Sequence, residues 1–120
     1  VEVSGNPCGV NAAYRVRRGP GRGLMLSGKA RGWKTLVELA ARGAHRKAGP
    51  RWPTEDLAVE IEWRWPSKRR RDVDGPAKGV LDAMEGVLYA DDCQVKRLVL
   101  TARVDPENPG ATITVGPRVA

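Results

Sequence analysis

The sequence predicts an α+β fold in which a mixed β-sheet is combined with two helices. Three observations favour this fold: the length of 120 residues, the alternation of apolar and polar residues over 57–65, and two segments with apolar residues at helical spacing. A chain of this length is large enough for one hydrophobic core, so residues 1–120 are expected to form a single domain. The elements are expected in the order β-α-β-α-β-β.

The N-terminal half is expected to contain a short strand and a long helix. Residues 2–7 are assigned to the strand, and the segment 19–23 is too rich in Gly and Pro for regular structure. The helix is expected over about 28–47, because apolar residues recur there every three or four positions. Ser27 is a suitable N-cap for this helix, and Gly49-Pro50 would end it.

The C-terminal half is expected to supply three strands and a second helix. Over 57–65, large apolar residues alternate with polar or small ones, which predicts a strand with one buried face. Pro76 suits the first turn of a helix over about 76–88, where its missing N–H does no harm. Two further strands are expected over 94–104 and 111–115, which are rich in β-branched and apolar residues.

The charges of the chain are sorted by region. Lys and Arg number 21 and Asp and Glu 14, which gives a formal net charge of +7 and a pI near 10.0. Residues 72–92 hold six acidic residues and one basic residue, a local net charge of −5, so the rest of the chain carries +12. Residues 14–34 contain seven bases and no acid, and Arg64 with 68–71 forms a second basic run. An acidic patch surrounded by basic residues indicates that the protein binds a partner with a phosphate backbone. The alternative is that the basic residues form an ordinary solvated surface.

Several classes of protein are not expected. The chain has no run of 18 apolar residues, and its N-terminus lacks the basic and apolar regions of a signal peptide, so no membrane association is expected. Cys8 and Cys93 are too few for a disulfide framework, and with His45 as the sole histidine they do not make a standard zinc site. The glycine motifs that bind nucleotide phosphates are absent, so no nucleotide cofactor is expected. The chain is therefore expected to work in a reducing, cytoplasmic compartment.

Asp72 and Asp74 are the first candidate metal ligands. Alternate residues of extended backbone point to the same side, so both carboxylates would project together if Val73 faced the core. Two neighbouring hard oxygen ligands suit Mg²⁺, or Mn²⁺ in its place. The alternative is that Asp74 caps the helix beginning near Pro76 and that Asp72 pairs with Arg71. For Asp74 alone, the cap is the favoured interpretation.

Asp91 and Asp92 lie between the second helix and the strand that follows it. Consecutive aspartates in such a position are commonly turn residues, and this is the alternative here. The interpretation of Asp91 and Asp92 as metal ligands requires that they lie close to Asp72 and Asp74 in the fold. The two carboxylate pairs flank the same short helix, and tight turns could bring both of its ends to one edge of the sheet.

Lys78 precedes Asp82 by four residues, so the two side chains share one face of the second helix. A structural ion pair is the favoured interpretation for Asp82. Lys78 also lies one helical turn from Asp74, where its ammonium group could contact a phosphate oxygen or a developing negative charge.

Taken together, these motifs resemble the core of the RusA-type Holliday junction resolvases. The signature of that family runs D-x-D-N-x-x-K-x-x-x-D-A-L, then a hydrophobic stretch, then D-D-x-Q-V. The similar segments here are Asp72-Val73-Asp74, Lys78, Leu81-Asp82-Ala83, Gly86-Val87-Leu88-Tyr89 and Asp91-Asp92-Cys93-Gln94-Val95. The N-terminal motif G-x-P-x-x-x-N-x-x-Y-R is also similar, through Gly5, Pro7, Asn11, Tyr14 and Arg15.

The resemblance implies a Mg²⁺-dependent, homodimeric endonuclease that cuts four-way DNA junctions by paired nicks. The metal-binding aspartates of the family fall on Asp72, Asp74 and Asp92, with Asp91 beside them. The essential lysine of the family falls on Lys78. The basic residues expected to bind the DNA backbone are Arg15, Arg17, Arg18, Lys68, Arg69, Arg70 and Arg71.

One departure from the family pattern bears on the function. Gly75 stands where the family has Asn, and Gly has no side chain with which to cap a helix or hold a carboxylate in place. Two rival functions follow from this departure. One is a branched-DNA-binding protein with weakened or lost catalysis, and the other is a nuclease for other DNA structures such as flaps or single strands.

Overall fold

Strands β1, β6, β4 and β5 form one sheet, in that order. The computed structural model describes residues 1–7, 14–16, 24–26 and 28–119. The four strands are β1 (Glu2–Ser4), β4 (Leu57–Trp65), β5 (Val95–Val104) and β6 (Gly110–Pro117). β6 runs antiparallel to β1 and β4, whereas β5 pairs parallel with β4. The predicted α+β class with a mixed sheet is therefore confirmed.

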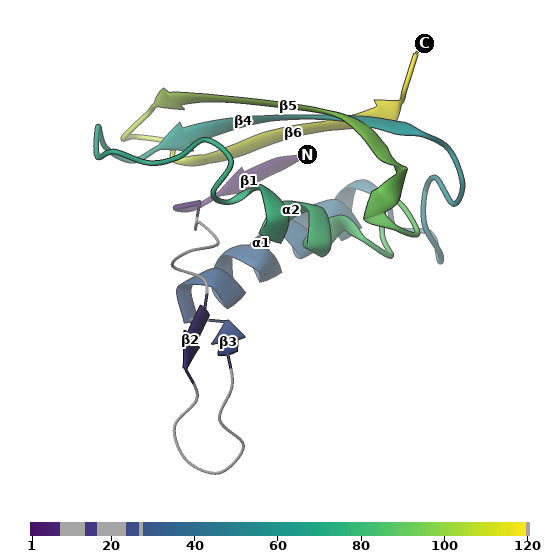
Figure 1. Cartoon of the computed structure of the whole chain (residues 1–120), viewed down its shortest axis with the longest axis horizontal. Coiled ribbons are helices and arrows are strands. Elements are labelled where there is room, and N and C mark those ends of the chain that lie inside the picture. The colour runs from purple at the N-terminus through teal and green to yellow at the C-terminus, as the bar shows by residue number, and fades with distance from the viewer. Residues whose placement is uncertain (8–13, 17–23, 27, 120) are drawn as a thin grey trace.

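Both predicted helices are present. α1 spans Gly28–Ala44 and α2 spans Ala77–Met84. Figure 1 shows the two helices on the same side of the sheet, while none of the described helices covers its other face. Neither α1 nor α2, nor any other described helix, has the length and apolar character that crossing a membrane requires.

The core lies between the sheet and the helices, and β4 contributes five of its large apolar side chains. The five β4 residues expected to face inward are all buried: Leu57, Val59, Ile61, Trp63 and Trp65. The helix residues in the same cluster include Trp33, Val37 and Ala41 of α1 and Ala77, Val80, Ala83 and Met84 of α2. Full burial of a large apolar side chain contributes about 1.5–3 kcal/mol. This cluster joins α2 to α1 and to β4, and the most extensive contacts of α2 are with α1.

Both helices end earlier than predicted. α1 stops at Ala44 and not near Lys47, because its buried stripe ends at Ala41 and the exposed Arg46 and Lys47 gain no apolar contact from further helix. α2 stops at Met84 and not near residue 88. The cause is a turn at Glu85 and Gly86: Glu85 is already extended, with a ψ of 132°, and Gly86 follows with a left-handed φ of +85°.

The strands also differ from the prediction. β1 ends at Ser4 and not at residue 7, because Gly5 takes a φ of +129° and its N–H donates to the carbonyl of Pro109. β6 extends beyond 111–115 because it pairs with β4 along its length. A separate pair, β2 (Tyr14–Val16) and β3 (Leu24–Leu26), was not predicted, since three residues are too few to show a period. Residues 19–23 and Ser27 lie outside the described residues.

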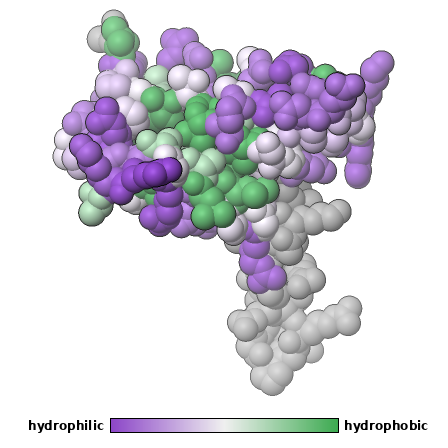
Figure 2. Space-filling view, turned by 180° about the vertical axis from the view of Figure 1, so that it is seen from behind, coloured by the Kyte–Doolittle hydropathy of each residue, from purple (hydrophilic) through white to green (hydrophobic). Residues whose placement is uncertain are grey.

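Some large apolar side chains remain on the surface. Figure 2 shows hydrophobic side chains gathered in the middle of one face, between hydrophilic regions. Among the described residues, exposed large apolar side chains include Leu36 and Leu39 on α1 and Leu98 and Val104 on the edge strand β5. Contiguous exposed apolar surface is typical of a site of contact with another macromolecule.

Candidate active site

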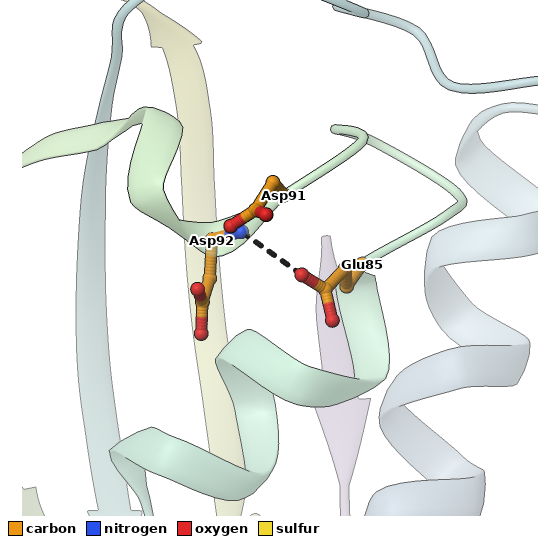
Figure 3. Close-up of side chains that lie close together, drawn as sticks. All are labelled: Glu85, Asp91 and Asp92. Atoms are coloured by element: carbon orange, nitrogen blue, oxygen red, sulfur yellow. Dashed lines mark hydrogen bonds between the residues drawn. The ribbon is translucent and has the colours of Figure 1, made fainter.

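Three carboxylates meet where α2 ends. One carboxylate oxygen of each of Glu85, Asp91 and Asp92 lies within 4.8 Å of the other two. Figure 3 shows the three side chains close together. The meeting follows from the local backbone. Gly86 turns the chain sharply, its N–H donates to the carbonyl of Tyr89 at 2.7 Å, and the chain then passes back beside Glu85. The Asp92 N–H donates to Glu85 Oε1 at 3.1 Å, which joins the two sides of this turn.

The buried side chain of Gln94 holds the acidic turn in place. Gln94 is the last residue of a short 3₁₀ helix, η2 (Asp92–Gln94), and not the first residue of β5 as predicted. Its Oε1 accepts hydrogen bonds from the N–H groups of Ala90 and Asp91 at 2.9 and 3.0 Å. Its Nε2 donates to the carbonyls of Trp52 and Glu55, both at 2.9 Å. The amide thus ties the backbone on which Asp91 and Asp92 lie to the segment before β4.

Asp91 has the turn role that the sequence left open. Its Oδ1 accepts from the Cys93 N–H at 2.9 Å and caps η2. This hydrogen bond lowers the pKa of Asp91, and the hydrogen bond between Asp91 and the thiol raises the pKa of Cys93. Cys93 is therefore held in its neutral form and is a poor nucleophile.

The negative charge of this region affects the pKa of Tyr89. Its hydroxyl donates to the carbonyl of Leu81 at 2.6 Å. Burial, followed by the charges of Asp92, Glu85 and Asp82, raises the pKa of Tyr89 far above its usual value. Tyr89 therefore stays protonated, and a cation near these carboxylates would be attracted by their combined charge.

Asp72 and Asp74 lie on the loop that enters α2. The Gly75 N–H donates to the Asp72 carbonyl at 3.2 Å and the Ala77 N–H to the Asp74 carbonyl at 3.1 Å, so these hydrogen bonds use the backbone. Both side chains are exposed, and within the described part of the chain neither carboxylate makes an ion pair or a hydrogen bond.

The expectation that Asp74 caps α2 is wrong. Pro76 occupies the N-cap position, and no side chain makes a capping hydrogen bond there. The alternative partner for Asp72 is also engaged elsewhere, because Arg71 donates to the carbonyls of Ser67 and Arg69 and lies over the ring of Trp65. Among the described residues, neither the Asp74 cap nor the ion pair of Asp72 with Arg71 is therefore present as an alternative to a functional role.

The two carboxylate pairs lie at opposite ends of α2. An eight-residue helix spans about 12 Å, and Asp72 and Asp74 belong to no group of three carboxylates within 4.8 Å among the described residues. Glu85 joins Asp91 and Asp92 instead, and the sequence prediction did not include it. The signal that could have found Glu85 is Gly86, because a Gly after an apolar helical stripe indicates the helix end and places the preceding residue beside the returning chain.

The basic residues fall into three groups. Lys78 is exposed and its Nζ lies 3.2 Å from Asp82 Oδ1, which confirms the predicted ion pair. Arg64 is buried and donates to the Asn108 carbonyl and Thr112 Oγ1, so it stabilises the sheet and does not belong to a DNA-binding surface, contrary to its place in the second basic run. Of the residues expected to contact DNA, Lys68, Arg69 and Arg70 are exposed, Arg71 is half-buried, Arg15 lies in β2, and Arg17 and Arg18 lie outside the described residues.

The comparison with protein families covers nearly the whole chain. The family model described as endodeoxyribonuclease RusA matches residues 5–116, which include both acidic segments and all of α1, β4, α2 and β5. The chain belongs to the RusA endodeoxyribonuclease family. The resemblance drawn from the sequence is thereby confirmed. Membership implies a Holliday junction-resolving endonuclease and supports nuclease activity on branched DNA. No curated protein matches the chain.

Proposed function

We propose that this chain is a Mg²⁺-dependent endonuclease that resolves Holliday junctions by paired, symmetrical nicks during DNA recombination and repair. The observation that carries the proposal concerns the surroundings of the Asp72 and Asp74 carboxylates. Both carboxylates face solvent ahead of α2 without an ion pair or hydrogen bond in the described chain. The described contacts give these two exposed carboxylates no structural task, although they are only two positions apart in the chain, and carboxylate oxygens suit cation binding.

The donor chemistry fits Mg²⁺. Magnesium takes one or two carboxylates together with several waters, and Mn²⁺ accepts the same oxygen ligands. Asp72 and Asp74 would hold the ion, with Asp92 as a third ligand once the loop before α2 and the turn after it approach each other, because the two segments lie at opposite ends of α2 in the structure. Asp91 keeps its cap on η2 and adds negative charge beside Asp92. Bound Mg²⁺ supplies Lewis-acid chemistry: it lowers the pKa of a bound water and stabilises the leaving oxygen of the phosphodiester.

Lys78 has the position for a catalytic contact in this proposal. It lies in the first turn of α2, just after the loop of Asp72 and Asp74. Its pairing with Asp82 keeps the ammonium group on that face of the helix, where it would offset charge that develops on the phosphate in the transition state. The exposed Lys68, Arg69 and Arg70 precede the same loop and would bind the phosphate backbone.

Paired nicks require two active sites. A four-way junction has two-fold symmetry, so a homodimer with one site per subunit matches it. The exposed apolar side chains on α1 and on the edge strand β5 offer surface for such an interface. DNA recombination places the working enzyme in the cytoplasm, on the nucleoid.

One observation favours a rival function. Gly75 contributes a backbone N–H to the loop, and α2 has no side-chain cap where the family places Asn. A loop with less support would hold its carboxylates more loosely. A branched-DNA-binding protein with weakened catalysis is therefore the second candidate.

A panel of DNA substrates tests these functions. A synthetic four-way junction, a flap, a single strand and a linear duplex are incubated with the protein in Mg²⁺ or in EDTA. We expect cleavage of the junction in Mg²⁺ and binding without cleavage in EDTA. Junction binding without cleavage at any Mg²⁺ concentration would establish the binding protein, and equal cleavage of flaps or single strands would establish a nuclease of another specificity.

A further inference from the structure

The loop that carries Asp72 and Asp74 is tied to the sheet by one indole. Trp63 of β4 is fully buried, and its Nε1–H donates to the carbonyl of Val73, the residue between the two aspartates. The side chain of Val73 is 39% exposed, so apolar packing does little to anchor the loop. Among the described residues, no other hydrogen bond joins residues 72–74 to the sheet.

The ring of Trp63 is itself fixed on both sides. Trp33 of α1 meets it edge-on, with ring centroids 6.5 Å apart and planes at 61°. Trp65 stacks against it at 6.0 Å and 23°. Aromatic pairs with centroids about 4.5–7 Å apart attract one another beyond the effect of burial alone. The indole N–H therefore has a defined direction.

The segment before the aspartates is fixed to the same rings. The Arg71 guanidinium lies 5.3 Å from the ring centroid of Trp65, and it donates to the carbonyls of Ser67 and Arg69 at 3.0 and 3.1 Å. The path from β4 to Asp72 is thus held by Trp65 through Arg71, and the peptide between Val73 and Asp74 is held by Trp63.

We propose that Trp63 is a positioning residue for the Asp72 and Asp74 carboxylates, with its indole N–H setting the affinity of this pair for a divalent cation. The inference deepens the proposed function, because it depends on these two aspartates binding Mg²⁺. The hydrogen bond from Trp63 restrains the peptide between Val73 and Asp74. Loss of a partner that orients metal ligands typically weakens metal affinity by about 10–100-fold.

The chain offers a matched control. Trp33 is as buried as Trp63 and belongs to the same aromatic cluster, but its Nε1 has no hydrogen-bond partner among the described residues. Trp63→Phe and Trp33→Phe therefore make the same chemical change, and Trp33→Phe keeps an aromatic ring against Trp63, so only Trp63→Phe removes the hydrogen bond to Val73. The full-length protein without DNA is titrated with Mn²⁺ and free Mn²⁺ is followed by electron paramagnetic resonance. Hydrogen exchange of the Gly75 amide is measured on the metal-free protein.

We expect Trp63→Phe to weaken Mn²⁺ binding by about tenfold and to accelerate exchange of the Gly75 amide, while Trp33→Phe changes the affinity by less than about twofold. Equal Mn²⁺ affinities and equal exchange rates for the two variants would overturn the positioning role. Asp72→Asn and Asp74→Asn are titrated in parallel. If they bind Mn²⁺ as the wild type does, the proposed metal site fails; if they lose Mn²⁺ while Trp63→Phe does not, only the role of Trp63 fails.

A measurement on the unaltered chain covers the case in which Trp63→Phe does not fold. The indole N–H signals of the wild type are followed by nuclear magnetic resonance while Mg²⁺ is added. We expect the Trp63 signal to shift more than that of Trp33, because only the former donates to the loop that binds the ion. Equal shifts, or no shift at Trp63 when Mg²⁺ binds, would contradict the proposal.

Discussion

Asp91 and Asp92 are neighbours in the chain, but their carboxylates have different surroundings. Asp91 accepts a hydrogen bond from the Cys93 N–H, which lowers its pKa and commits it to the cap of η2. Asp92 is half-buried beside Tyr89, and its charge is the largest of the three carboxylate contributions that raise the pKa of that tyrosine. We therefore expect Asp92, and not Asp91, to be the direct ligand of a cation.

Replacing the proposed metal ligands tests the site one residue at a time. Asp72→Asn, Asp74→Asn and Asp92→Asn should each lower the rate of junction cleavage by about 10³-fold or more, since each removes a ligand of the ion that stabilises the transition state. Junction binding should stay unchanged or tighten, because one negative charge facing the phosphates is lost. Gel-based cleavage and binding assays measure the two effects separately.

Glu60→Gln is the control for these variants, since Glu60 is exposed on β4 and its loss should leave cleavage intact. A normal cleavage rate for Asp74→Asn, together with a lower melting temperature, would show that this aspartate has a structural role in the loop and not a catalytic one.

Lys78→Ala separates catalysis from helix stability. Loss of a group that stabilises transition-state charge should slow cleavage at saturating DNA by about 10²-fold, with little change in junction affinity. Loss of the exposed pair with Asp82 should lower the free energy of unfolding by only about 0.2–0.5 kcal/mol. Single-turnover cleavage and chemical denaturation give the two values.

The double variant Lys78→Ala/Asp82→Ala completes this test. If Lys78 only balances Asp82, removal of both charges should restore the cleavage rate. A rate for Lys78→Ala within about threefold of the wild type would exclude the catalytic assignment without touching the metal site.

At the scale of residues, the sequence predicted which side chains carry the chemistry better than it predicted which residues contact one another. The sorting of charge along the chain indicated the aspartates, and the four-residue spacing indicated the pair of Lys78 with Asp82. Both signals can be read from neighbouring positions in the sequence. The role of Arg64 could not be predicted, since its hydrogen-bond partners Asn108 and Thr112 are more than forty positions away. Glu85 was overlooked for the same kind of reason: its place beside Asp92 depends on how the chain turns at Gly86.

At the scale of elements, the turn after α2 depends on Gln94. The side chain is buried and makes four hydrogen bonds, so Gln94→Ala would leave two N–H groups and two carbonyl groups without their partner. An unsatisfied buried polar group costs about 1–3 kcal/mol. We therefore expect Gln94→Ala to lower the free energy of unfolding by about 2–4 kcal/mol, after partial compensation by water.

Urea denaturation measures this change, with Thr114→Ala as the control, because Thr114 is exposed on β6 and its replacement should have an effect within about 0.5 kcal/mol. An effect of Gln94→Ala no larger than that of Thr114→Ala would contradict the anchoring role of the amide.

The elements themselves were largely predictable, and their ends were not. The alternation over 57–65 identified β4 with its correct bounds and inward face, because a sheet with one covered face imposes that period. The end of α2 depends on the backbone of Glu85, which is extended, and of Gly86, which is left-handed. The apolar Val87 and Leu88 continue the helical pattern beyond this turn, but they are buried outside the helix. Strand order was not accessible either, since it follows from tertiary pairing of β6 between β1 and β4.

At the scale of the whole molecule, the sorted charge should govern affinity for DNA. Lys68, Arg69 and Arg70 are exposed on the loop leading to Asp72. Their joint replacement by Ala should reduce the slope of log affinity against log salt concentration by about 2–3 units, as expected when three phosphate contacts are lost. Fluorescence anisotropy with a labelled junction measures the slope. Arg42→Ala is the control, because Arg42 is already paired with Glu38 at 3.0 Å, and an equal loss of slope in this control would mean that no localised DNA surface exists.

The central claim is that two metal-dependent sites cut one junction symmetrically, and mapping of the nicks tests it most directly. A four-way junction is labelled in turn on each of its four strands and incubated with the wild type or with Asp74→Asn in Mg²⁺. We expect the wild type to nick two opposing strands at positions related by the two-fold symmetry of the junction, and Asp74→Asn to bind the junction without nicking it. Nicks confined to one strand, nicks at unrelated positions, or equal cutting by Asp74→Asn would contradict it.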